Sequence, residues 1–272
     1  MMRIRPTAQD EAQGTTPGSP YGFFGLLFLL SVPFWLVGAF VGEEILPGLP
    51  MSSAMVVCPA LAACILVYRS GGAAALRPFL GRAGDFTRMR GWVWAFALGV
   101  MPVVMVLSGV IQVALGDPLP PFQFDPVQAV ALFGLFFVAA TAEEIGWSGH
   151  ATRPLAEAHG PILAGVIIGA VASLWHLIPL LQVERTLEWI AWWAAGSIAR
   201  RVCIVWMFVR GGQSVFSTSL FHAMSNLSWM LFPVMGSHYD PMVTGSVLIA
   251  ATSLLLLISG VRSSGAGRRG AP

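Results

Sequence analysis

Two adjacent glutamates, Glu143 and Glu144, follow an uninterrupted apolar run in the segment FFVAATAEEIGWSGHATRP. Neighbouring residues of a helix point about 100° apart, so one carboxylate can face the interior of a helix bundle while the other takes a helix partner. A carboxylate in a low-dielectric site has a raised proton affinity, which suits a general base near neutral pH. Beside an imidazole, such a base could activate a water molecule for attack on a peptide carbonyl.

A second group of polar side chains lies in the apolar segment LFHAMSNLSW, which contains His222 and Asn226. A separation of four residues places both on one helix face, about 5 to 6 Å apart at their Cβ atoms. Their N–H groups could stabilise an oxyanion, or the two side chains could bind a metal ion. An interhelical hydrogen bond is the structural alternative. A further imidazole, His176, lies near the end of another apolar segment.

These side chains belong to a chain that is too apolar for a soluble domain. Of its 272 residues, 56% are hydrophobic and 10% are charged, against roughly 25% charged in an ordinary soluble domain. Because about 20 apolar residues cross the hydrocarbon core as a helix, we predict an all-α polytopic bundle of about eight transmembrane helices, with seven as the alternative. The predicted spans are 21–41, 51–68, 91–115, 127–147, 161–181, 188–210, 213–235 and 241–260.

The arginines predict the orientation, because positive residues near helix ends are retained on the cytoplasmic side. With eight spans, the predicted inner segments carry nearly all the arginines, and the predicted outer loops carry acidic residues and Arg185. We therefore expect an integral protein of the plasma (inner) membrane with both termini in the cytoplasm and a substrate approaching from the cytoplasmic side. Nothing resembles a basic recognition helix, so we do not expect nucleic-acid binding.

The chain is predicted to form one membrane domain, residues 21–260. Residues 1–20 are rich in Pro, Gly, Thr and Gln and are expected to be a disordered cytoplasmic leader, and residues 261–272 a basic cytoplasmic tail. Any chemistry must therefore take place within or beside the bilayer, in contact with membrane lipid.

The depth of the polar groups presents a conflict. If the fourth span ended soon after the glutamates, Glu143 and His176 would lie at depths in the membrane that differ by roughly 15 to 20 Å. A long, tilted helix that continued through GWSGHATRPLAEA would place Glu143 near the middle of the membrane. Gly146, Gly149 and Pro154 would then be kink sites, which membrane helices tolerate where neighbours satisfy the freed backbone groups.

Three motifs, in this order, resemble those of the CAAX-protease and bacteriocin-processing family of intramembrane endopeptidases, which includes the type II CAAX prenyl endopeptidases. They are EEIGWSGHATRPL, then LWHL at 174–177, then RGGQSVFSTSLFHAMSN. The resemblance covers about residues 125–232, where we expect the catalytic core. It implies an enzyme that hydrolyses a membrane-associated peptide or protein.

The resemblance also implies a role for each polar residue. Glu143 would be the general base, and His176 would help to polarise the attacking water. His222 and Asn226 would stabilise the oxyanion, and Glu144 would be a supporting carboxylate. We expect no cofactor for this mechanism.

Two positions depart from the family pattern. Ser148 stands where the family has an arginine, which removes a charge partner of the glutamates, and Ala172 stands where the family has an aromatic residue. Arg201, or its neighbour Arg200, lies in the middle of a predicted span and could supply the missing charge. A buried Glu–Arg pair would also explain why arginine is tolerated there.

The sequence is also compatible with other functions. GWSG matches the Gly-x-Ser-Gly pattern of rhomboid serine proteases, with Ser148 as nucleophile. A divalent metal such as zinc could activate water if it were held by Glu143, His176, His222 and Asn226. From a different class, the same groups could serve a proton-coupled transporter, or the chain could be a catalytically silent immunity or scaffolding protein.

Overall fold

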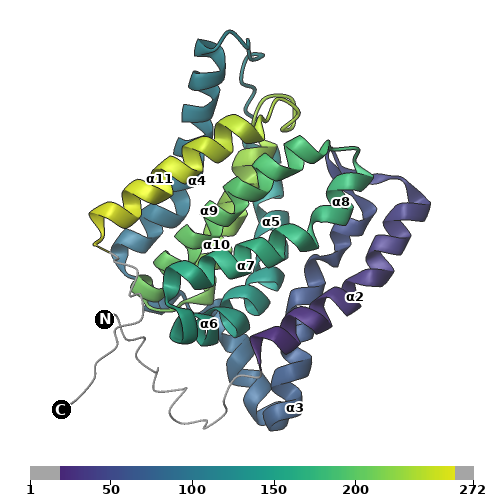
Figure 1. Cartoon of the computed structure of the whole chain (residues 1–272), viewed down its shortest axis with the longest axis vertical. Coiled ribbons are helices and arrows are strands. Elements are labelled where there is room, and N and C mark those ends of the chain that lie inside the picture. The colour runs from purple at the N-terminus through teal and green to yellow at the C-terminus, as the bar shows by residue number, and fades with distance from the viewer. Residues whose placement is uncertain (1–18, 261–272) are drawn as a thin grey trace, which may run out of the picture.

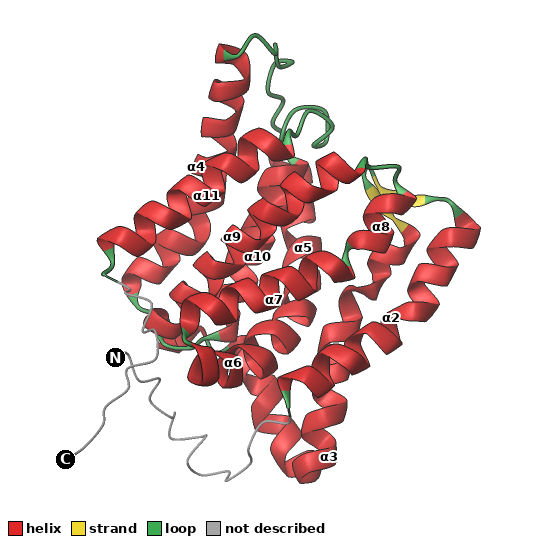
Figure 2. Ribbon diagram, in the orientation of Figure 1, coloured by secondary structure: helices red, strands yellow, loops and turns green. Residues whose placement is uncertain are grey.

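A computed structural model of the chain describes residues 19–260, which form a bundle of helices with one short two-stranded hairpin (Figures 1 and 2). The predicted tail and nearly all of the predicted leader lie outside these residues. The elements are α2 (Pro20–Val41), β1 (Glu44–Leu46), β2 (Leu49–Pro50), η1 (Met51–Val57), α3 (Cys58–Gly81), η2 (Arg82–Gly84), η3 (Phe86–Arg88), α4 (Gly91–Ala114), α5 (Pro126–Gly146), η4 (Trp147–Ala151), α6 (Thr152–His159), α7 (Pro161–Trp175), α8 (Leu177–Gln182), α9 (Leu187–Gly211), α10 (Val215–Met230) and α11 (Pro241–Ile258).

The predicted class, an all-α polytopic membrane protein, is confirmed. Each predicted span contains a helix, and within residues 19–260 six helical stretches are long and apolar enough to cross a membrane. The other two predicted spans are α9 and α10. Helix α9 has 25 residues but carries Arg200 and Arg201 in its middle, and α10 has 16 residues. The seventh span, predicted as 213–235, was too long, because α10 ends at Met230. The second and fourth spans are longer than predicted, since each belongs to a helical stretch of 34 residues.

The fourth span resolves the depth conflict. Helix α5, the π-helical turn η4 and α6 form one stretch from Pro126 to His159, so Glu143 lies near its middle. At its start, the Asp125 carboxylate accepts hydrogen bonds from two backbone N–H groups of the first turn, which caps the helix. In the π-helical turn, the guanidinium of Arg82 donates to the carbonyl of Gly149 at 3.1 Å. Neighbouring side chains thus satisfy backbone groups that the turn frees.

Glycines allow α9 to pack closely against α7. A Cβ atom added at Gly169 would lie 2.8 Å from the Ile198 Cα atom and 3.2 Å from the Arg201 Cβ atom. A Cβ atom at Gly165 would lie 2.8 Å from the Val202 Cα atom. Small residues at such a crossing let two helix backbones approach each other. This approach carries Arg201 into the interior of the bundle.

We predict that Gly169→Ala lowers the free energy of unfolding by about 1 to 3 kcal/mol, because the added methyl group forces α7 away from α9. Gly99→Ala in α4 is the matched control, since nothing lies within 4 Å of its added Cβ atom. There we expect no loss of stability. Unfolding of the purified proteins in detergent measures both effects, and equal stability of the two variants would contradict the packing described for Gly169.

Candidate active site

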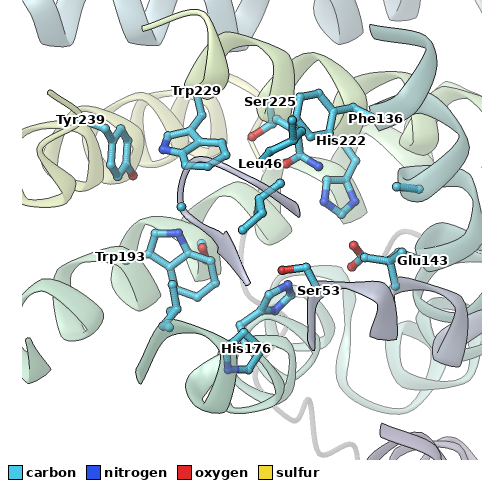
Figure 3. A pocket seen from close by; sticks show the side chains of 18 of the residues that line it. Leu46, Ser53, Phe136, Glu143, His176, Trp193, His222, Ser225, Trp229 and Tyr239 are labelled. Atoms are coloured by element: carbon cyan, nitrogen blue, oxygen red, sulfur yellow. The ribbon is translucent and has the colours of Figure 1, made fainter. Parts of the chain in front are cut away.

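An internal cavity of about 380 Å³ brings most of the predicted site residues together (Figure 3). Its lining includes Glu143 of α5, His176 at the junction of α7 and α8, and His222 and Asn226 of α10. Most of the remaining lining is apolar and comes from the β1–β2 hairpin, η1, α4, α5, α9, α10 and α11. Side chains from three distant segments of the chain therefore face one cavity.

The two glutamates have different surroundings. The Glu143 side chain lines the cavity and accepts a hydrogen bond of 3.3 Å from the indole Nε1 of Trp147, one turn further along the helix. Glu144 is fully buried and is not part of the cavity lining. This difference follows from the angle of about 100° between adjacent helical residues.

Glu144 is held by three side chains. Nη1 of Arg201 lies 2.8 Å and 2.9 Å from its two carboxylate oxygens, and the Ser148 hydroxyl donates to it at 2.5 Å. His222 Nδ1 lies 2.9 Å from Oε1. The buried Glu–Arg pair expected from the sequence is thus present, with Arg201 and Glu144 as its members. Ser148 and Arg201 thus both contact this carboxylate.

Hydrogen bonds orient both imidazoles. A carbonyl or carboxylate can accept but not donate, so the ring nitrogen that contacts it carries the proton. His176 Nδ1 lies 2.8 Å from the carbonyl of Ala172, which leaves Nε2 of this ring to accept a proton or a hydrogen bond. His222 Nδ1 contacts Glu144 in the same manner. Each ring therefore has its Nε2 atom available for chemistry.

Helix α9 contributes Trp189 and Trp193, which the sequence analysis missed, and Arg200, which it considered only as a charge partner of the glutamates. Trp193 packs against the His176 ring with centroids 5.4 Å apart, although position 172 lacks the family's aromatic residue. Arg200 lines the cavity and donates to the Ser225 hydroxyl at 2.8 Å. Trp189, Trp193 and Arg200 recur at spacings of four and seven residues, which places them on one helix face. That spacing could have revealed a polar and aromatic face directed at the site.

The mouth of the cavity includes Tyr239, in the connection before α11. Burial raises the pKa of its phenol to about 12, because removal from water disfavours the phenolate. The side chain therefore remains a neutral hydroxyl group that can donate a hydrogen bond.

The serine-nucleophile alternative does not fit the position of Ser148. Its side chain is fully buried, donates to Glu144 and is not part of the cavity lining. We predict that Ser148→Ala retains peptide cleavage and lowers the free energy of unfolding by about 1.5 to 3 kcal/mol, the contribution of a hydrogen bond to a charged group. Cleavage rates and unfolding of the purified variant measure this, and complete loss of cleavage in a stably folded variant would contradict it.

The metal-ion alternative would use Glu143, His176, His222 and Asn226, which all line the cavity. Within residues 19–260, no three or more His, Cys, Asp or Glu side chains lie close enough together to hold a metal ion. Glu143, His176 and His222 share the cavity but do not form such a group. The Glu144 carboxylate is already occupied by Arg201 and His222.

Two comparisons with known proteins cover the region that contains this site. The family described as type II CAAX prenyl endopeptidase Rce1-like matches residues 125–228, which include Glu143, His176, His222 and Asn226. A CAAX prenyl protease 2 from Methanococcus maripaludis is 23% identical over 262 residues, covering 88% of this chain and 93% of the relative.

The fold and the site define the class as a polytopic helical membrane protein with a Glu–His cavity inside the bundle. The two matches confirm the resemblance to the CAAX-protease and bacteriocin-processing family, over the region that carries all three motifs. They support an integral membrane enzyme of the CAAX protease type.

Proposed function

We propose that this protein is an intramembrane endopeptidase that cleaves a membrane-associated peptide or protein with a water molecule activated by Glu143 and His176. The observation that supports this most strongly is the division between the two glutamates. Glu143 faces the cavity with both imidazoles, while Glu144 is paired with Arg201 and held out of the cavity. Glu143 can therefore exchange a proton with a water molecule in the cavity. Glu144 holds the side chains of Arg201 and His222 in position.

The proposed reaction begins with a water molecule between Glu143 and His176. The carboxylate takes a proton from water while His176 Nε2 accepts a hydrogen bond from it, and the oxygen attacks the peptide carbonyl. A carbon–oxygen bond forms, and the carbonyl oxygen becomes an oxyanion. When the intermediate collapses, the carbon–nitrogen bond breaks, and the leaving amine takes the proton held by Glu143. Collapse gives a carboxylic acid and an amine, and the proton of the acid then passes to the amine, so the final products are a carboxylate and an ammonium group.

His222 and Asn226 are proposed to stabilise the oxyanion. They lie one turn apart on α10, and both line the cavity. The Asn226 amide donates N–H groups directly. His222 Nδ1 faces Glu144, so Nε2 can donate only when both ring nitrogens carry protons. Donors fixed in advance in a site that excludes water are the usual means of stabilising such an oxyanion.

The substrate is proposed to carry an apolar segment at the cleavage site. The cavity is lined mainly by apolar side chains, including Met101, Met105, Phe136 and Trp193. The relative from Methanococcus maripaludis is named a CAAX prenyl protease, so a peptide with a prenylated residue is one suitable test substrate, beside unmodified apolar peptides. We further propose that the protein resides in the plasma (inner) membrane with both termini in the cytoplasm.

We predict that cleavage persists after exhaustive chelation, because the proposed base and oxyanion donors are all protein side chains. The measurement is the cleavage rate of protein purified in the presence of strong chelators and assayed with and without added zinc. Loss of activity on chelation, with recovery on addition of zinc, would contradict a metal-independent mechanism.

Reconstitution into lipid vesicles separates a protease from a transporter that uses the same polar groups. We expect cleavage of a membrane-tethered peptide with no proton gradient across the vesicle. Proton flux that depends on Glu143, without any cleavage, would instead support the transporter.

A further inference from the structure

The cavity extends from the middle of the bundle to one end only. Its deep residues, Glu143, His176 and His222, lie near the middle of the bundle. Towards the mouth, its lining comes from the hairpin, the connection between α8 and α9, the first turn of α9, the last turn of α10 and the connection before α11. In Figure 1 these segments lie at the end of the molecule opposite α6 and the lower end of α3.

The charges identify this end as the outer one. Among residues 19–260, the end at which the cavity opens carries a single arginine, Arg185. Positive residues collect on the cytoplasmic side of membrane proteins, whereas acidic residues show little such bias. The opposite end carries seven arginines: Arg69, Arg77, Arg82, Arg88, Arg90, Arg153 and Arg210.

The mouth is framed by aromatic rings and covered by the hairpin. Gly48, at the tip of the hairpin, lies so close to Trp229 and Arg185 that an added Cβ atom would be 3.3 Å and 3.6 Å from them. The Arg185 guanidinium lies 4.8 Å from the centre of the Trp189 ring, which in turn packs against Tyr239. Trp and Tyr are enriched where a membrane meets water. The aromatic side chains around the mouth therefore lie at the depth expected for the outer membrane–water interface.

The inner side of the site is closed. Trp147, Ala151 and Leu155 follow Glu143 towards the inner end, and all are at most 1% exposed. Trp147 packs edge-on against Trp175 and Phe23. The Glu144–Arg201 pair fills the adjacent interior. A peptide that approached from the inner side would therefore have to displace closely packed aromatic side chains.

We infer that the substrate reaches Glu143 from the outer side of the membrane, beneath the β1–β2 hairpin. The substrate is then an apolar peptide segment exposed at the outer leaflet, in contrast to the cytoplasmic approach expected from the sequence. The inference rests on the proposed endopeptidase function and on the orientation given by the arginines. The hairpin must move away from Trp229 to admit the peptide.

Single cysteines at defined positions test the side of access without any cleavage assay. Ser53 lines the cavity with Glu143 and His176 (Figure 3), and Ser53→Cys changes one atom. Ile45→Cys on the exposed hairpin marks the outer end, and Ala158→Cys on the exposed end of α6 marks the inner end. The probe is a charged, membrane-impermeant thiol reagent applied to intact cells and to inside-out vesicles. The unsubstituted protein gives the background from Cys58, Cys64 and Cys203.

The expected result is that Ser53→Cys and Ile45→Cys react about tenfold or more faster in intact cells than in inside-out vesicles, because a charged reagent crosses the hydrocarbon core slowly. Ala158→Cys should show the reverse preference. Reaction of Ser53→Cys from the inner side, or from neither side while Ile45→Cys reacts, would overturn the inference. Absence of peptide cleavage alongside the expected labelling would instead count against the endopeptidase function alone.

Discussion

Replacing Arg201 with leucine is expected to lower the free energy of unfolding by about 3 to 5 kcal/mol, because it leaves a buried carboxylate without its cation. Arg201 is 4% exposed, and its partner Glu144 is fully buried. Cleavage should also fall sharply, since Glu144 is the group that orients His222. Unfolding in detergent and the rate of peptide cleavage measure the two effects.

The controls separate loss of the ion pair from loss of any arginine. Arg69→Leu on the exposed surface of α3 is the matched variant, and substitutions at such surface positions change stability by about 0.5 kcal/mol or less. Adding Glu144→Met to Arg201→Leu should recover part of the stability, because an apolar pair of similar volume replaces an unpaired charge. If Arg201→Leu folded and cleaved as well as the wild type, the proposed role of the pair would be wrong.

Replacing Glu143 with glutamine is expected to reduce the cleavage rate by about 10² to 10⁴, the usual contribution of a general base. The amide keeps the size of the side chain and its carbonyl oxygen, which can still accept from Trp147 Nε1. Stability should therefore change little. The measurements are the initial rate of cleavage and the unfolding transition of the same preparation.

The neighbouring glutamate provides a sharp contrast. Glu144→Gln should lower stability, because it removes the charge that Arg201 faces. Glu157→Gln, on the exposed end of α6, removes only a surface ion pair with Arg153; such pairs contribute about 0.2 to 1 kcal/mol, and cleavage should be unchanged. If Glu143→Gln retained full activity while Glu144→Gln lost it in a stable fold, the two roles would have to be exchanged.

Much of the fold follows from the sequence. Runs of apolar residues near the length of the hydrocarbon core predicted every long helix. The cost of placing arginine within a membrane predicted a buried partner for it, and the structure contains that partner. The continuous fourth span was also anticipated, because Glu143 could not otherwise reach the depth of His176.

Other features could not be predicted because they depend on packing between distant segments. Arg200 and Arg201 are adjacent, so their spacing could not show which one faces Glu144. The choice follows from the close approach of α7 and α9 at Gly165 and Gly169. The β1–β2 hairpin consists of only a few residues, too short for an alternating pattern to be visible. Its position over the cavity depends on contacts with Arg185 and Trp229.

The most direct test of Glu143-dependent peptide hydrolysis uses purified protein in lipid vesicles with a library of membrane-tethered peptides, and detects the products by mass spectrometry. We predict that the wild type and Glu157→Gln cleave the same peptides. Glu143→Gln and His222→Ala should be folded but should produce almost none of these fragments. Equal cleavage by all four proteins would contradict the proposed function.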